Sequence, residues 1–159
     1  MSKRVLMVMV AALMIFGFTM DSGSQGRGSA PVVEGIFATP EFNHGDVVKI
    51  YIHATDADGD IRWVRVTAGN YTAVTRVKKD MGGNLNGYIF WSSSQAARRE
   101  GKITLQIAVD DWAGNESNAV SVPLVMKAGG AKMQPPPAEF KDVEIGPVMI
   151  QPTPFSGGA

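Results

Sequence analysis

The sequence predicts an all-β protein: a seven-stranded antiparallel sandwich, preceded by a signal peptide and followed by a tail rich in proline and glycine. Two observations support the sandwich. Apolar and polar residues alternate over several short segments, which is the period of a half-buried strand. Turn-forming residues separate these segments at intervals of about 8–12 residues, and no long helical pattern interrupts them.

Residues 1–24 have the pattern of a secretory signal peptide. Lys3 and Arg4 form a basic start, and an uncharged apolar run follows up to residue 20. As a helix this run would span about 24 Å, less than the roughly 30 Å hydrocarbon core of a bilayer. Ser22 and Ser24 supply small residues for cleavage after Ser24. We therefore predict export to the periplasm or the extracellular space. The alternative is an uncleaved anchor, which alone would give the chain a membrane contact.

The first part of the domain begins after a short linker at residues 25–30, whose glycine and serine content is typical of a flexible segment. We assign residues 31–127 to the sandwich. A first edge strand is expected at residues 32–37, and a turn-rich connection leads to a second strand at residues 47–54. In that second strand Val48, Ile50 and Ile52 share one face.

The middle of the domain contains two more strands and a loop. Residues 61–68 alternate again, and residues 71–79 are rich in Thr and Val, which favour strands. Residues 80–87 contain several Gly and Asn residues, so we predict a loop there.

The last three strands are predicted at residues 88–92, 102–110 and 117–126. Residues 93–101 have the only local helical character, and we expect a single turn that crosses between the sheets. The alternation is clearest in residues 102–110, which identifies them as a strand with one buried face.

The tail, residues 128–159, is predicted to be disordered. Its prolines are incompatible with a central strand, and residues 134–137 favour an extended polyproline conformation. In the alternative, its apolar residues anchor an extended strand on the sheet edge of a partner or of this domain. Those residues are Phe140, Val143, Ile145, Val148 and Ile150.

Three segments resemble known modules: GDVV at residues 45–48, ATDADGDI at residues 54–61 and VDDWAGNES at residues 109–117. On these segments residues 31–127 resemble bacterial immunoglobulin-like modules of the fibronectin type III and cadherin-like kind. The resemblance implies an exported domain that serves in adhesion, spacing, assembly or carbohydrate binding. It names no specific activity.

The two acidic turns form the candidate site, because the corresponding loops of such a sandwich lie at the same end. Carboxylate and amide oxygens at this density suit Ca²⁺, which takes six to eight oxygen ligands. The candidate calcium ligands are Asp56, Asp58, Asp60, Asp110, Asp111 and Asn115. The EF-hand pattern fails, since Gly59 and Thr67 stand where that loop has other residues. The alternative is that Asp and Asn only cap the turns by bonding their own backbone.

Trp112 is the candidate for ligand stacking, since it lies in a turn where burial is not required. The alternative is that it packs into the core like most tryptophans. His44 and His53 lack the spaced partners of a transition-metal site, and no G-x-S-x-G segment presents a nucleophile. We therefore expect no catalytic residues and no cofactor other than calcium.

Charge and composition limit the classes of partner that we expect. Fifteen basic and 15 acidic residues give zero formal charge, which argues against nucleic acid. The absence of Cys excludes disulfides and thiolate chemistry. The expected function is that of a non-enzymatic module binding another envelope or surface protein. The alternative is a carbohydrate-binding module that holds a polysaccharide on surface aromatics.

Overall fold

The computed structural model describes residues 28–43, 46–92, 101–129, 132–146 and 148–152, the last with its backbone alone. The predicted signal peptide lies outside these ranges, as does nearly all of the predicted helical turn at residues 93–101. Within them, no helix combines the length and apolar character required to cross a membrane.

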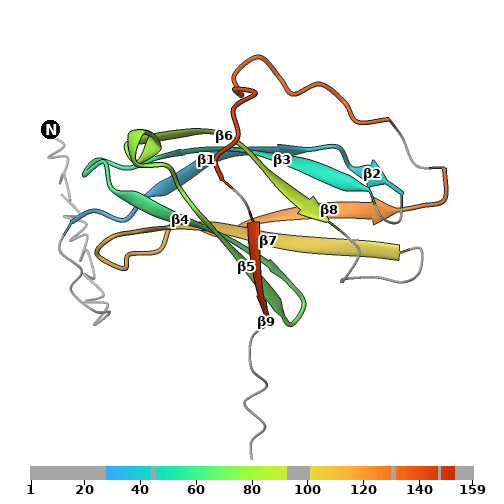
Figure 1. The fold of residues 1–159 in the computed structure, drawn as a ribbon, viewed down its shortest axis with the longest axis horizontal. Helices are drawn as coiled ribbons and strands as arrows, with labels where there is room; N and C mark the ends of the chain where they lie inside the picture. The colour runs from blue at the N-terminus through green and yellow to red at the C-terminus, as the bar shows by residue number, and fades with distance from the viewer. Residues whose placement is uncertain (1–27, 44–45, 93–100, 130–131, 147, 153–159) are drawn as a thin grey trace, which may run out of the picture.

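Two β-sheets make up the fold, and they lie one above the other (Figure 1). The first sheet has the order β1-β3-β6. Its strands are β1 (Val32–Ala38), β3 (Val47–Thr55) and β6 (Asn84–Ser92). The second sheet has the order β2-β8-β7-β4-β5-β9. Its strands are β2 (Glu41–Phe42), β4 (Ile61–Ala68), β5 (Tyr71–Arg76), β7 (Gly101–Asp111), β8 (Val120–Met126) and β9 (Val148–Pro152). A 3₁₀ turn, η1 (Lys79–Met81), precedes β6.

The prediction of an all-β fold is confirmed, but the pairing is not wholly antiparallel. The short strand β2 runs parallel to β8, with Val125 N donating to Pro40 O and Lys127 N to Phe42 O. Phe42 is buried and packs edge-on against Trp91, at 5.9 Å between ring centroids. Burial of this aromatic ring holds β2 along the edge of β8. From the sequence, a turn is expected for this segment.

The core lies between the two sheets, where alternating residues of each strand meet. Ile50, Ile52, Leu105, Ile107 and Val109 have no exposed surface, in agreement with the alternation in their strands.

β6 begins earlier than predicted, because residues 84–87 belong to the strand rather than to a loop. Leu85 is fully buried in the core, and Asn86 is also buried. The Asn86 amide donates to Glu139 O at 2.8 Å and accepts from Lys141 N at 2.8 Å. Core burial and these bonds to a distant segment outweigh the turn-forming composition of residues 80–87.

The described part of the tail packs on the domain, in contrast to the predicted disorder. After the prolines, the chain crosses the outer face of the first sheet and reaches the edge of β6 (Figure 1). There Tyr88 N donates to Val143 O at 2.8 Å, and Ile145 N donates to Tyr88 O at 2.9 Å. Ile145 is fully buried. The chain then forms β9, which pairs antiparallel with β5. This matches the alternative expectation from the sequence, in which the tail adds a strand to the domain's own sheet edge.

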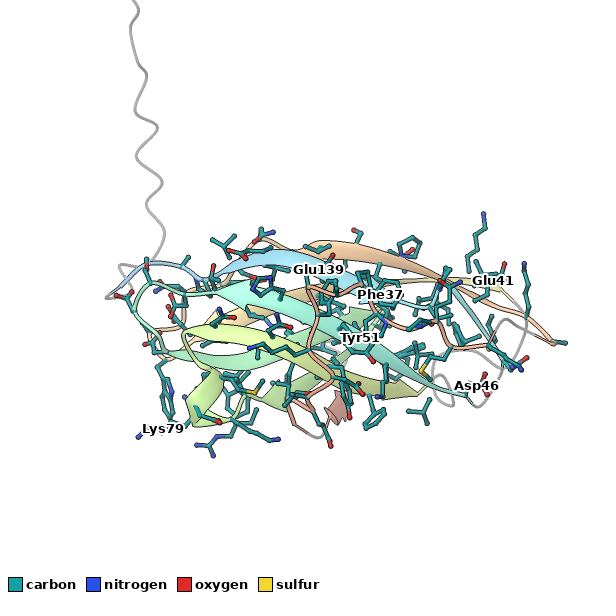
Figure 2. All side chains as sticks on the ribbon, turned by 90° about the horizontal axis from the view of Figure 1, so that it is seen from above. Phe37, Glu41, Asp46, Tyr51, Lys79 and Glu139 are labelled. Atoms are coloured by element: carbon teal, nitrogen blue, oxygen red, sulfur yellow. The ribbon has the colours of Figure 1, made fainter. Side chains whose placement is uncertain are left out.

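Side chains of the first sheet hold the tail in place. Phe140 lies against Phe37 and Tyr51, with ring centroids 6.3 and 6.2 Å away. Asp142 accepts hydrogen bonds from Lys49 Nζ at 2.7 Å and from Tyr51 OH at 3.0 Å. In Figure 2, Phe37, Tyr51 and Glu139 lie near the middle of the molecule. The tail therefore covers the central part of this face.

Candidate functional site

Three loops meet at one end of the two sheets, which we call the three-loop end: residues 56–60, residues 79–83 and residues 112–116. Their backbones are bonded to one another. Trp112 N donates to Asp60 O at 3.2 Å, and Ile61 N donates to Gly82 O at 3.1 Å. Gly59 has a φ of 75°, a left-handed conformation that favours glycine and closes the acidic turn. The two acidic turns are thus joined directly.

Asp56 and Asp60 are the candidate ligands with unused oxygens. Asp56 is 7% exposed, and its Oδ2 accepts from Asp60 N at 2.9 Å. Asp56 Oδ1 and Asp60 Oδ1 are both buried without a hydrogen-bond partner in the described residues. Burial raises the pKa of Asp60 above its ordinary value, and the neighbouring Asp56 side chain and the charge of Asp111 raise it further. These surroundings disfavour the ionised form of the Asp60 carboxyl.

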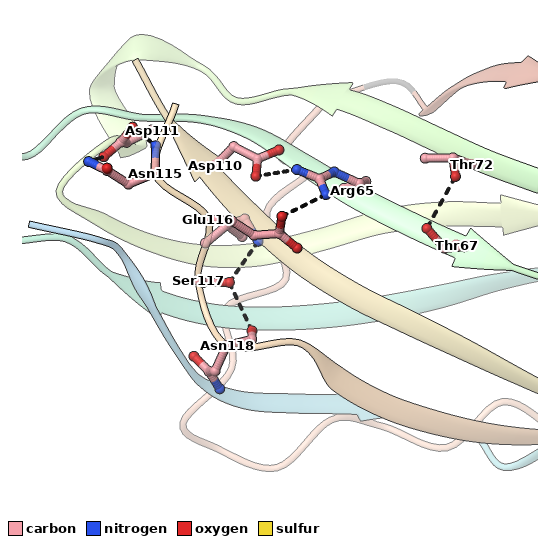
Figure 3. Close-up of polar contacts among 10 residues, drawn as sticks. Arg65, Thr67, Thr72, Asp110, Asp111, Asn115, Glu116, Ser117 and Asn118 are labelled. Carbon is pink, nitrogen blue, oxygen red and sulfur yellow. Dashed lines mark hydrogen bonds and ion pairs between the residues drawn. The ribbon is translucent and has the colours of Figure 1, made fainter. Parts of the chain in front are cut away.

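Asp58 and Asp110 are engaged elsewhere. Asp58 Oδ2 accepts from Ser29 N and, at 3.0 Å, from Ser29 Oγ, and these bonds lower the pKa of Asp58. Asp110 pairs with Arg65, whose other guanidinium nitrogen bonds Glu116 at 2.9 Å (Figure 3). Both carboxylates are therefore stabilised without a metal ion.

Asp111 and Asn115 form a closed turn. The two oxygens of buried Asp111 accept from Asn115 N at 2.8 Å and from Asn115 Nδ2 at 2.6 Å (Figure 3). The structured ranges contain no group of three or more His, Cys, Asp or Glu residues arranged to hold a metal ion. Four of the six predicted ligands are thus engaged in turns, in bonds to Ser29 or in an ion pair, and among the six only Asp56 and Asp60 keep buried oxygens without a partner in the described residues. Two carboxylates fall short of the six to eight oxygens that Ca²⁺ takes, so water would have to supply most of the remainder.

Trp112 does not pack into the core. Its side chain is 57% exposed, and the guanidinium of Arg62 lies 3.7 Å from its ring centroid. Trp63 lies on the same guanidinium at 4.8 Å. Arg62 Nε is buried and has no hydrogen-bond partner among the described residues. Because Nε is enclosed by the protein, an incoming acceptor would meet the terminal nitrogens of the guanidinium instead.

A groove of about 990 Å³ opens beside this stack, lined in part by Asp60, Trp112 and Ile145. Its basic lining residues are Arg62, Arg76, Lys78 and Lys79. Lys78 Nζ donates to Glu144 O at 2.7 Å, which links the groove to the tail. None of the four has a carboxylate partner within 4 Å in the described residues. Lys79 lies at the opposite end of the molecule from Glu41 and Asp46 (Figure 2).

Sequence reasoning missed this basic groove because the net charge of the chain is zero. The signal lay in the β4–β5 hairpin, where Trp63 pairs with Arg76 and Val77 N bonds Arg62 O. That register brings Arg62 beside residues 76–79, which contain three basic side chains. Comparing the charges of residues that face each other across this hairpin, rather than summing charge over the chain, would have identified the basic groove.

Three other aromatic side chains and His53 have partners within the domain. Trp91 is buried, while Tyr51 and Tyr88 pack against each other at 5.5 Å. His53 Nδ1 lies 3.4 Å from Glu34, and His44 lies outside the described residues.

Comparison of the chain with family models, curated proteins and solved structures gave no match.

Proposed function

We propose that this protein is an exported, non-enzymatic, immunoglobulin-like module that mediates adhesion or assembly at the bacterial cell envelope. The observation that carries the proposal is the open groove at the three-loop end. Its exposed tryptophan and its basic side chains, which have no carboxylate partner among the described residues, are suited to holding a partner.

The strand order supports the immunoglobulin-like part of the proposal. Without β2 and β9, the sheets are β1-β3-β6 and β8-β7-β4-β5. In immunoglobulin-type sandwiches the strands divide between two sheets in a comparable way. In the variable type, the sheet that contains the third strand also carries an additional strand that follows it in sequence, as β5 follows β4 here. Loops at one end of such sandwiches commonly form the binding surface.

Calcium is part of the proposal as a stabilising ion at the Asp56–Asp60 pair. A cation there would neutralise two close carboxylates and use their unpartnered oxygens. Thermal melting in calcium and in chelator tests this. At a hundredfold excess over its dissociation constant, the ion would add about 2.7 kcal/mol to the free energy of unfolding. Equal midpoints would leave turn capping as the role of these residues.

Export and envelope binding are tested by fractionating a bacterium that expresses the full chain. We expect the protein in the periplasmic or extracellular fraction, shortened by cleavage after Ser24, and retained on the washed envelope. Trp112→Ala should lower retention. Tyr71→Ala is the matched control, because Tyr71 is also exposed, at 47%, but starts β5 at the far end of the hairpin.

The possible results separate the parts of the proposal. Cytoplasmic protein would refute export. Exported protein that washes off the envelope would refute envelope binding, and equal retention of both variants would remove the groove as the binding site.

A further inference from the structure

We infer that the groove at the three-loop end binds an acidic polysaccharide, with the sugar ring on Trp112 and its carboxylates on Arg62, Arg76 and Lys79. This inference rests on the proposed binding function and names its ligand class.

Charge is the first argument. Four basic side chains surround the groove, and none has a carboxylate partner among the described residues. A concave surface lined mainly by charges of one sign, as here with Asp60 the exception, concentrates the field and attracts ligands of the opposite sign. Planar guanidinium groups, such as those of Arg62 and Arg76, match the geometry of a carboxylate.

The Arg62–Trp112 stack is the second argument. Stacking fixes the guanidinium plane before a ligand arrives, so less side-chain entropy is lost on binding. The 57% exposure of Trp112 leaves apolar indole surface on which the C–H face of a sugar ring can be buried.

The backbone of the groove walls favours a polysaccharide over an acidic peptide. Peptides often bind by adding a strand to a free sheet edge. Here Val77 N already bonds Arg62 O, and Ile61 N bonds Gly82 O. A Cβ built on Gly146 would lie 2.6 Å from Arg76 O, so the tail closely covers this edge. Recognition is therefore left to side chains, which suits a ring that stacks and carries carboxylates.

Asp60 is the acidic residue among those lining the groove. Its Oδ1 is buried, beside Asp56. A cation at this pair would remove its repulsion of an acidic ligand.

The test is titration of the exported, full-length mature protein with polygalacturonate, followed by tryptophan fluorescence and calorimetry. We expect saturable binding that weakens as salt rises, and no binding of neutral dextran. Trp112→Ala and Arg76→Gln should each weaken binding about tenfold or more, as removal of a central contact does. Lys102→Gln is the matched control, since Lys102 lines a different pocket together with Tyr71 and should leave affinity unchanged.

Poly-L-glutamate provides the competing ligand class. Equal affinity for poly-L-glutamate, with no loss in Trp112→Ala, would overturn the inference in favour of an acidic protein partner. No saturable binding of polygalacturonate would also overturn it. If polygalacturonate does not bind but retention on the envelope still depends on Trp112, the proposed function stands with another ligand. If polygalacturonate does not bind and the protein is not retained on the envelope, both the inference and the proposed function are refuted.

Discussion

Ile145→Ala measures how far the tail is part of the fold. Ile145 is fully buried, although it follows a segment whose composition is typical of disorder. The substitution removes three methylene-sized groups at about 0.8 kcal/mol each. A residual cavity adds to this transfer cost, and Ile→Ala in a core costs about 2–5 kcal/mol in total. We expect a loss of about 3 kcal/mol and a midpoint about 10 °C lower.

Urea unfolding followed by tryptophan fluorescence, together with thermal melting, gives both numbers. Val143→Ala is the matched control, because Val143 belongs to the same segment but is 46% exposed. Its backbone bond to Tyr88 survives the substitution. We expect this control to lie within about 0.5 kcal/mol of the unmodified protein. If Ile145→Ala also lies within that range, the tail does not contribute to the core and the reasoning is wrong.

Three further predictions concern the same contacts and the acidic turns. Gly87→Ala should displace the tail, because a Cβ there would collide with Val143 O; hydrogen exchange of the tail amides would show it, and unchanged protection would contradict it. Hydrogen bonds from Lys49 and Tyr51 lower the pKa of Asp142. The stabilisation that these bonds give the folded state is therefore present above the unfolded pKa of ~3.9 and is lost as pH falls through the lower folded value. NMR spectra recorded down to about pH 2 should therefore show loss of the contacts of Asp142 with Lys49 and Tyr51 in acid, whereas unchanged contacts would argue against this contribution. Asp111→Ala removes the acceptors of two Asn115 donors and should cost about 1–3 kcal/mol in urea unfolding, while a neutral result would show that the turn does not depend on them.

Strand positions could be predicted wherever burial follows a simple alternation. Residues 102–110 are the clearest case, and β7 extends over them with its apolar face in the core. β6 shows the limit of that approach. Residues 84–87 have turn composition, but Leu85 has its place in the core and Asn86 bonds the tail. Both contacts join residues far apart in sequence, so they cannot be predicted from local strand propensity.

The proximity of the two acidic turns could be predicted from the sequence, but the partners of their carboxylates could not. The topology of the expected sandwich brought the two acidic turns together, as the bond from Trp112 N to Asp60 O shows. It did not show which carboxylates find local partners. Asp110 is neutralised by Arg65 from the neighbouring strand, a pairing that depends on the register of β4 against β7. The basic groove was missed for the same reason, since Arg62 and Arg76 meet only through the register of the β4–β5 hairpin.

The tail closes the open edges of both sheets on one side, and this arrangement leads to a last prediction. Residues 143–145 bond the edge of β6, and β9 pairs with β5. An uncovered strand edge presents unpaired backbone groups that can template association. Deleting residues 139–159 should therefore produce species whose mass by light scattering rises with concentration, beyond that of the full chain.

Deleting only residues 153–159 is the control, since β9 is then retained. Circular dichroism must show that the longer deletion still folds, because it also removes Ile145 from the core. A folded deletion variant with the mass of the full chain at every concentration would show that the covered edges do not drive association. If association does appear, the tail occupies the edges that a partner strand could otherwise use. The three-loop end, which the tail borders without filling, would then be the more accessible surface for a ligand.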